Sequence, residues 1–261
     1  MTINSVANNQ LNTSMIRIAT GQRINSAADD AAGLAISDRM TAQIRGLEQG
    51  TRNVMDMQSL VNTAEGGLST INDSLLRIRE LTVQSMNGIL TDDDRQRIQH
   101  EIDQLVTEID AVTERTEFNT MRLLDGSFSA EDGRGLHTAA DASGRGPTVY
   151  IGNMTSGMLL GPEPFNVVSG EFSLQRLDDA LAQVSRERSY LGAMSNRFDT
   201  TIASNQIANL NLAAARSNIR DADIALEVMN MQQQNILEQA QLMVERRQQE
   251  QDGPQIASLL T

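Results

Sequence analysis

One stretch of the sequence places apolar residues at alternating spacings of three and four over several helical turns. The positions in this series are Val54, Met57, Val61, Ala64, Leu68, Ile71, Leu75 and Ile78. Such a heptad series is the seam of a helix that packs along a partner helix, and chance rarely sustains it for so long. At about 1.5 Å per residue, the segment is ~37 Å long. The pattern predicts a long helix that begins near Leu34 and needs partner helices to bury its seam.

A second heptad seam follows after a short connection. Asn87-Gly88 is typical of a helix end, because glycine is the usual residue past a helix C-terminus. Thr91 and Asp94 are typical of the next start, where threonine caps the backbone and an acidic side chain reaches back. The apolar positions of the second seam are Ile98, Ile102, Leu105, Ile109 and Val112. Two seams joined by a short loop predict an antiparallel hairpin of helices.

The middle of the chain interrupts this helical pattern. Three of the four prolines lie there, at Pro147, Pro162 and Pro164, and the segment Thr148–Ile151 favours a strand. Helical spacing returns from Ser173 and continues, with interruptions, toward the C-terminal end. The sequence therefore predicts a mainly α fold, a long antiparallel helical bundle or coiled coil formed by the N- and C-terminal segments. A small β-hairpin region is expected in its middle.

The charge and composition exclude several classes of protein. The formal net charge is −13, and all 21 basic residues are arginine. This acidic balance argues against a nucleic-acid partner and against docking on an anionic membrane. The chain has no cysteine, so it can form neither a disulfide framework nor a thiolate metal site. It has no run of the ~20 apolar residues that span a bilayer, and its N-terminus lacks the basic and apolar regions of a secretory signal.

No residue pattern supports catalysis or metal binding. His100-Glu101 resembles the start of a zinc-protease motif, but that motif needs a second histidine where Gln104 stands. The acidic run Asp92–Asp94 lies at a predicted helix N-terminus, whose dipole repels cations, so capping is the better interpretation. No glycine-rich phosphate loop follows a strand, and no nucleophile elbow occurs. We therefore predict no catalytic residue, no metal, no cofactor and no enzymatic activity.

Five motifs, in the same order along the chain, resemble those of bacterial flagellin. They are Gly21–Ser37 (GQRINSAADDAAGLAIS), Leu75–Ser85 (LLRIRELTVQS), Thr116–Asn119 with Leu123–Gly126, Ala215–Asp223 and Ile236–Ala240. The resemblance covers almost the whole chain and indicates a short form with a reduced variable region. It implies a structural subunit that self-assembles into the bacterial flagellar filament for swimming motility. Two alternatives stay open, a hook–filament junction protein and a non-polymerising, flagellin-like binding module.

The resemblance also implies a division into three parts. Residues 1–32 and 219–261 would form inner-core terminal helices with connecting segments. Residues 33–128 and 170–218 would form the outer-core helical bundle, and residues 129–169 a short β-rich surface region. We expect the inner core to line the channel of a filament and the bundle to make its wall.

Two groups of side chains are singled out by the same resemblance. The first matches positions that pack between subunits and that engage the Toll-like receptor that senses flagellin, and it comprises Arg77, Leu81, Gln84 and Glu101. The second belongs to the connection between inner and outer cores, and it comprises Arg23, Asn25, Asp29, Asp30, Arg220, Asp221 and Asp223. Within this connection we expect an ion pair between Arg23 and the adjacent aspartates.

The implied partners are further copies of the chain in a helical filament. Flagellar cap and junction proteins, an export chaperone and the host flagellin-sensing Toll-like receptor complete the expected set. The implied location is extracellular, in the bacterial flagellum. Export would run through the flagellar type III system without a cleaved signal peptide.

Overall fold

The computed structural model describes residues 2–130, 133–161, 165–170 and 172–259. It divides into a terminal unit, made of Met1–Ile44 and Leu210–Thr261, and a central unit, Arg45–Asn209. Two long helices, α2 (Ala27–Ser85) and α5 (Leu174–Arg220), contribute residues to both units. The mainly helical fold class is thereby confirmed. The three-part division at residues 32, 128 and 170 stays a prediction.

The central unit is built on the two predicted seams. Seven of the eight positions of the first seam are buried in α2, and Met57 packs against them from the edge. The second seam lies on α3 (Asp92–Arg115), where Leu105 is half-buried and the other four positions are buried. Apolar residues of α5 complete this core, among them Leu177, Val184, Leu191 and Phe198.

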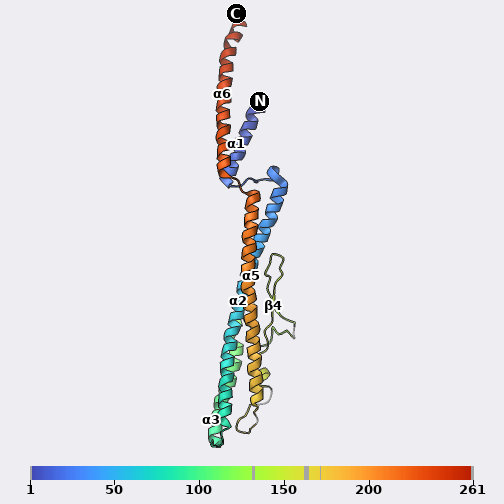
Figure 1. Cartoon of the computed structure of the whole chain (residues 1–261), viewed down its shortest axis with the longest axis vertical. Helices are drawn as coiled ribbons and strands as arrows, with labels where there is room; N and C mark the ends of the chain where they lie inside the picture. Colours follow the sequence, from blue (N-terminus) through green and yellow to red (C-terminus); the bar gives the residue numbers. More distant parts are fainter. Residues whose placement is uncertain (1, 131–132, 162–164, 171, 260–261) are drawn as a thin grey trace. The chain divides into compact units, whose positions relative to one another are not determined.

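Polar contacts show that α2 and α5 run antiparallel in the central unit (Figure 1). Gln58 donates to Asp199 at 2.8 Å near one end. Glu65 pairs with Arg188 at 2.8 Å, about three turns further along α5 toward its start. Arg79 pairs with Asp178 at 2.8 Å near the other end. Exposed ion pairs contribute only ~0–1 kcal/mol each, so the buried seam holds the helices together and the pairs mark their register.

The start of α3 has the predicted cap. The side chain of Thr91 accepts a hydrogen bond from the backbone N–H of Asp94 at 3.3 Å. The Asp94 carboxylate accepts from the backbone N–H of Thr91 at 3.1 Å and from its hydroxyl at 2.7 Å. This reciprocal box satisfies amides that a helix start leaves without partners. The preceding helix, α2, ends at Ser85, two residues before the predicted Asn87-Gly88.

Replacing Thr91 by Ala is expected to lower the free energy of unfolding by ~1 kcal/mol, because the Asp94 amide loses its acceptor. The matched control is Thr107→Ala, an exposed position inside the same helix whose hydroxyl donates only to the Asp103 carbonyl. The control should not destabilise, since alanine has the higher helix propensity. Urea unfolding measures both variants, and equal losses would show that the cap contributes nothing.

The same cap should make stability depend on acidity. Hydrogen bonds from the Thr91 hydroxyl, and then from its backbone N–H, lower the pKa of Asp94. A carboxyl with a lowered folded-state pKa contributes stability above its unfolded pKa and loses that contribution as the pH falls through the folded pKa. The difference between wild type and Thr91→Ala is therefore expected to shrink between pH 7 and about pH 3.

Two small hairpins and one short helix connect α3 to α5. Strand β1 (Glu117–Phe118) pairs with β2 (Met121–Arg122), and β3 (Leu136–His137) pairs with β4 (Thr148–Val149), both antiparallel. A short helix, α4 (Ser156–Leu159), follows. The β-prone Thr148–Ile151 segment thus forms a strand at its first two residues. The first hairpin was not predicted. Its turn holds Asn119 and Thr120 at φ of 49° and 65°, the left-handed region that two-residue hairpin turns require.

The β3–β4 segment packs closely against α2 over two glycines one turn apart. A Cβ atom built on Gly46 would lie 2.5 Å from the Cβ of Ala142, and one on Gly50 would overlap the Ala140 carbonyl oxygen. Two amides fasten the same stretch. Asn53 donates to the Ala139 carbonyl at 2.9 Å, and Asn205 of α5 donates to the Ala140 carbonyl at 2.8 Å. The hairpin therefore contacts α2 backbone to backbone.

The terminal unit contains a pair of helices, α1 (Thr2–Thr20) and α6 (Ile224–Leu259), which lie side by side (Figure 1). Its other members are the start of α2 and the end of α5. We predicted that the first long helix begins near Leu34, but α2 begins at Ala27. Asp30 interrupts it with extended backbone angles (φ −164°, ψ 98°), and its carboxylate accepts from the Gly33 N–H at 2.8 Å. The predicted start is close to the point where regular helix resumes. Within the described parts of the chain, no helix has the length and apolarity to cross a membrane.

Candidate functional site

The connection between the helices of the terminal unit is held by backbone pairing. Gln22 and Asp221 form an isolated antiparallel bridge. The Arg220 carbonyl accepts from the N–H groups of Arg23 at 2.6 Å and Ile24 at 3.4 Å. The Ala222 N–H donates to the Gly21 carbonyl at 2.9 Å. Two motifs almost 200 residues apart in the sequence, Gly21–Ser37 and Ala215–Asp223, therefore meet as neighbouring strands of backbone.

Two arginines of this connection donate to the opposite segment. Arg220 donates to the Gln22 side chain at 2.9 Å, to the Ser37 hydroxyl at 3.4 Å, and pairs with Asp38 at 3.6 Å. Arg23 donates to the Ile219 carbonyl at 2.6 Å. The expected ion pair of Arg23 with Asp29 and Asp30 does not form. The two carboxylates are instead occupied by the start of α2.

The remaining predicted residues of the connection act as helix caps and turns. Asp29 accepts from Ser26, through its N–H at 2.8 Å and its hydroxyl at 3.0 Å, and from the Asn25 N–H at 3.2 Å. These bonds, first that of the Ser26 N–H, lower the pKa of Asp29. Asn25 itself donates to the Gln22 carbonyl at 2.8 Å. Each bond orients the chain as it turns into α2.

The two aspartates between α5 and α6 make different hydrogen bonds. Asp221 accepts from the Ser217 hydroxyl at 2.5 Å, which closes the end of α5. Asp223 accepts from the N–H groups of Ala225 at 3.0 Å and Leu226 at 3.2 Å, which caps the start of α6. All seven predicted connection residues thus lie in one region of the terminal unit. Their role as the joint between inner and outer cores stays a prediction.

A buried polar cluster that we did not predict joins α1 to α6. Glu227 on α6 is 8% exposed. Its carboxylate accepts from the Ser14 hydroxyl and from the Arg17 guanidinium on α1, both at 3.1 Å. A buried carboxylate is costly unless it is paired and hydrogen-bonded, so these contacts select one register of the two helices. The signal in the sequence was an acidic residue inside an otherwise uncharged helical stretch.

In the central unit, Arg77 of α2 forms an exposed ion network. It donates to Glu101 of α3 through two nitrogens at 2.9 and 2.8 Å and to Glu80 at 3.1 Å. These bonds, first those to Glu101, raise the pKa of the Arg77 guanidinium. Gln84 is exposed on the following turns, but Leu81 is 2% exposed and belongs to the core. Arg77, Gln84 and Glu101 are thus accessible to another protein, whereas the Leu81 side chain is not. His100 and Glu101 belong to no cluster of metal-binding groups among the described residues.

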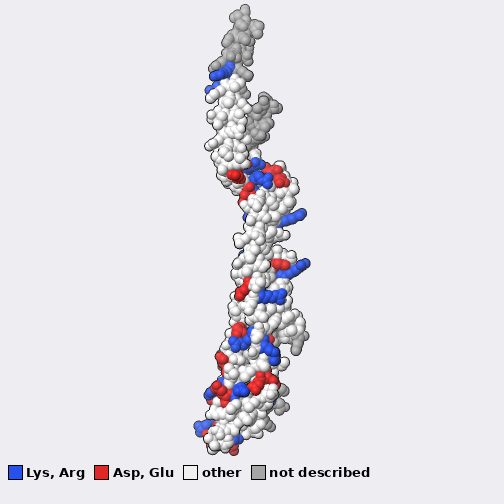
Figure 2. Space-filling view, viewed as in Figure 1, with Lys and Arg blue, Asp and Glu red and all other residues white. Residues whose placement is uncertain are grey.

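An apolar stripe on α6 is left exposed. Met229, Ile236 and Met243 recur at the heptad interval and are 60%, 66% and 66% exposed. Between residues 228 and 244 the only charged residue is Glu238. Figure 2 shows this part of α6 as almost free of charge, while acidic and basic side chains are mixed over the central unit on the side in view. Exposed apolar patches of this kind mark surfaces that pack against other protein.

Fold and surfaces together define a long-helix structural protein, whose N- and C-terminal segments pair and whose terminal helices keep an apolar face. The family model of the bacterial flagellin N-terminal helical region matches residues 1–129, and that of the C-terminal helical region matches residues 174–256. The chain belongs to the bacterial flagellin family, which is a family of structural proteins.

Individual relatives agree with this assignment. The chain is 39% identical to the flagellar filament 30.7 kDa core protein of Treponema maltophilum, over 90% of this chain and 87% of that protein. It is 40% identical to a flagellin of Halalkalibacterium halodurans, over 89% of this chain and 85% of that protein. A solved structure of a flagellar hook-associated protein from Vibrio parahaemolyticus has a TM-score of 0.59 at 18% identity. It covers 74% of this chain and 100% of that one, and it supports the fold alone.

Proposed function

We propose that this chain is a structural subunit that packs with copies of itself into the bacterial flagellar filament and has no catalytic role. The observation that carries the proposal is the heptad stripe of Met229, Ile236 and Met243 on α6. Withdrawing a stripe this apolar from water lowers the free energy by roughly 25 cal/mol per Å² of buried surface. The relative at 39% identity is named a flagellar filament core protein and the one at 40% identity a flagellin, which supports a filament as the destination.

Contacts that do not close into a ring generate open helical assemblies, and a filament is such an assembly. The junction alternative is not favoured, because the likeness to a hook-associated protein lies at the level of the fold. We place the subunit outside the cell in the flagellum, exported by the flagellar type III system with the help of a chaperone. The cap and junction proteins are its proposed neighbours. Arg77, Gln84 and Glu101 are the proposed contact surface for other subunits and for a host Toll-like receptor.

The test is seeded polymerisation of purified monomer in a precipitating salt, followed by sedimentation and negative-stain electron microscopy. Wild type is expected to form long uniform filaments. The double variant Ile236→Ser/Met243→Ser should lose at least about 90% of the sedimented fraction, because each change removes ~1.5–3 kcal/mol of apolar burial per contact. The control Gln232→Ser/Gln239→Ser changes two exposed polar residues at the same interval on the same helix.

The control variant should polymerise like wild type. Persistent wild-type monomer would contradict the filament proposal and favour the binding-module alternative. Filaments of normal yield from the Ile236→Ser/Met243→Ser variant would show that assembly does not use this stripe.

A further inference from the structure

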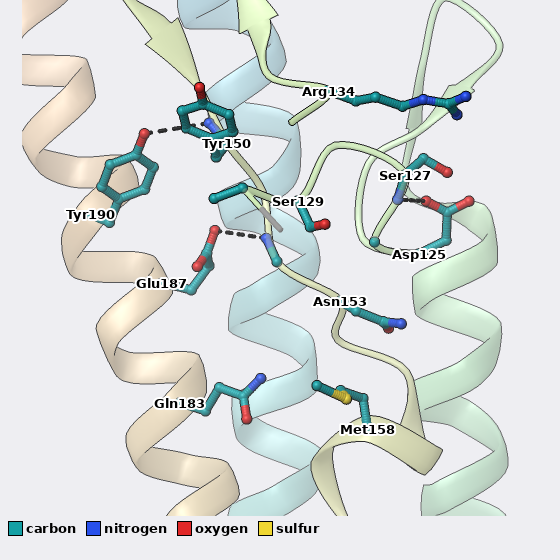
Figure 3. Close-up of a pocket in the computed structure, with 13 residues that line it drawn as sticks. Asp125, Ser127, Ser129, Arg134, Tyr150, Asn153, Met158, Gln183, Glu187 and Tyr190 are labelled. Atoms are coloured by element: carbon teal, nitrogen blue, oxygen red, sulfur yellow. Dashed lines mark hydrogen bonds between the residues drawn. The ribbon is translucent and has the colours of Figure 1, made fainter. Parts of the chain in front are cut away.

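A cleft of about 700 Å³ lies in the central unit between one face of α5 and the loops that flank the β3–β4 hairpin (Figure 3). Gln183, Glu187 and Tyr190 enter it from α5 at positions i, i+4 and i+7, which share one face of a helix. Asp125 and Asn153 are among the residues that enter it from the loops. The volume lies within the ~300–1,000 Å³ that small-molecule sites occupy. Neither the family assignment nor the proposed filament role uses this cleft.

Three polar side chains of the cleft are each held through one atom. Glu187 accepts from the Gly152 N–H at 3.1 Å through one carboxylate oxygen. The Tyr190 hydroxyl oxygen accepts from the Tyr150 N–H at 3.3 Å. Asn153 uses its amide oxygen to accept from Thr155, through the N–H at 3.0 Å and the hydroxyl at 2.8 Å. The side chains therefore have defined positions before any ligand arrives, which lowers the entropy cost of binding.

Each of these three side chains keeps one further hydrogen-bonding group without a partner among the described residues. This holds for the other carboxylate oxygen of Glu187, the hydroxyl proton of Tyr190 and the amide nitrogen of Asn153. Gln183 makes no hydrogen bond to any described residue, so its amide offers both a donor and an acceptor. Burial raises the pKa of Glu187, and the Gly152 N–H opposes that rise. The cleft thus presents donors and acceptors in close alternation.

Two glycines make room for this arrangement. A Cβ atom on Gly126 would lie 2.8 Å from the Cβ of Asn153, and Gly126 has a φ of +89°. A Cβ atom on Gly135 would lie 2.5 Å from the ring of Tyr150. Both side chains therefore occupy space that any residue with a side chain would fill. The Tyr150 ring is backed by Gly135 on one side and borders the cleft.

We propose that this cleft binds a small neutral saccharide. Sugar hydroxyl groups each donate and accept, so they match the alternating groups of Gln183, Glu187 and Asn153 better than a ligand of one polarity does. The aromatic ring of Tyr150 has a negative face that attracts the C–H face of a pyranose. Anions are disfavoured because the carboxylates of Asp125 and Glu187 outnumber Arg134, the one cationic residue on the described lining. A simple cation would leave the donors of Asn153 and Tyr190 without acceptors.

The experiment titrates glucose, galactose and N-acetylglucosamine, each as the free sugar and as its methyl glycoside, into the full-length monomer. Binding is followed through ¹H–¹⁵N shifts of the Tyr150 and Gly152 amides, which report directly on Tyr190 and Glu187. At least one sugar is expected to give a saturable shift with a Kd of ~1 mM. Response to the methyl glycoside as well as to the free sugar identifies the end of a glycan chain as the ligand. Response to the free sugar alone identifies a free monosaccharide.

Gln183→Ala and Glu187→Gln are each expected to weaken binding about tenfold. Gln183 has no bond to lose among the described residues, and glutamine at 187 can still accept from Gly152, so both variants should fold. The control Gln206→Ala makes the same change at an exposed position of α5 outside the cleft and should bind like wild type. No saturable shift up to about 100 mM sugar, or equal affinity in all variants, would overturn the proposal. Stronger binding of guanidinium than of any sugar would overturn it as well.

Discussion

Replacing Glu227 by Ala is expected to loosen the pairing of α1 with α6 by about 2 kcal/mol. The substitution removes the acceptor of Ser14, which is buried, and of Arg17, whose Nε is buried without a partner among the described residues. Breaking a buried pair leaves the remaining polar groups desolvated, and this cost exceeds the value of the bonds themselves. The partial exposure of Arg17 limits the loss, since its guanidinium can recover some water.

Hydrogen exchange of peptides from α1 and α6 measures this effect, with an expected rise of about 30-fold in exchange rate. The control Glu238→Ala makes the same change on the same helix, at a residue without an ion pair in the described structure. Glu227→Gln keeps an acceptor for Ser14 but removes the charge. Its exchange rate should therefore lie between those of Glu227→Ala and Glu238→Ala. Equal exchange in Glu227→Ala and Glu238→Ala would mean that apolar contacts alone hold the helices together.

Gly50→Ala is expected to displace the β3–β4 hairpin from α2 and to cost about 1–3 kcal/mol, even though alanine favours helix. The added methyl group would overlap the carbonyl of Ala140. That carbonyl cannot move away freely, because Asn205 donates to it and Asn53 holds the carbonyl of Ala139. We expect the Ala140 amide, which donates to the Arg145 carbonyl, to lose its protection from exchange.

Gly66→Ala provides a control with the opposite sign. Gly66 lies in the same helix, and a Cβ atom there would meet nothing within 4 Å. Alanine should therefore stabilise the helix by up to ~1 kcal/mol through its higher propensity. Urea unfolding compares the two variants directly. Equal stabilisation by Gly50→Ala and Gly66→Ala would show that the hairpin does not depend on the glycine contact.

Local patterns predicted the long helices and their seams well. Seven of the eight heptad positions from Val54 to Ile78 are buried, because a period of three and four places them on one face of a helix. The Thr91–Asp94 box formed because both of its partners lie within one turn. The β1–β2 hairpin was missed, since its strands have two residues each and its turn uses Asn119 and Thr120 rather than glycine. Strands this short leave almost no periodic signal.

The resemblance to flagellin singled out candidate residues, but it did not predict which residues surround them in the structure. Arg77 and Glu101 lie together on the surface of the central unit, but Leu81 points into its core. Arg23 was expected to pair with nearby aspartates because they are close in sequence. In the structure the α2 start occupies those carboxylates, and Arg23 reaches a carbonyl 196 residues away. A capping bond is local and forms with the helix itself, so it takes precedence over an exposed ion pair.

Periodicity, caps and composition were enough to establish a mainly helical chain with an interrupted middle and no disulfides. These properties depend on neighbours within a few turns, and such neighbours are visible in the sequence. The Glu227 cluster, the glycine contact of Gly50 and the cleft around Glu187 depend on residues that are distant in sequence. Their partners are chosen by how helices and loops pack, because only packing decides which polar atoms are buried and where a methyl group has no room.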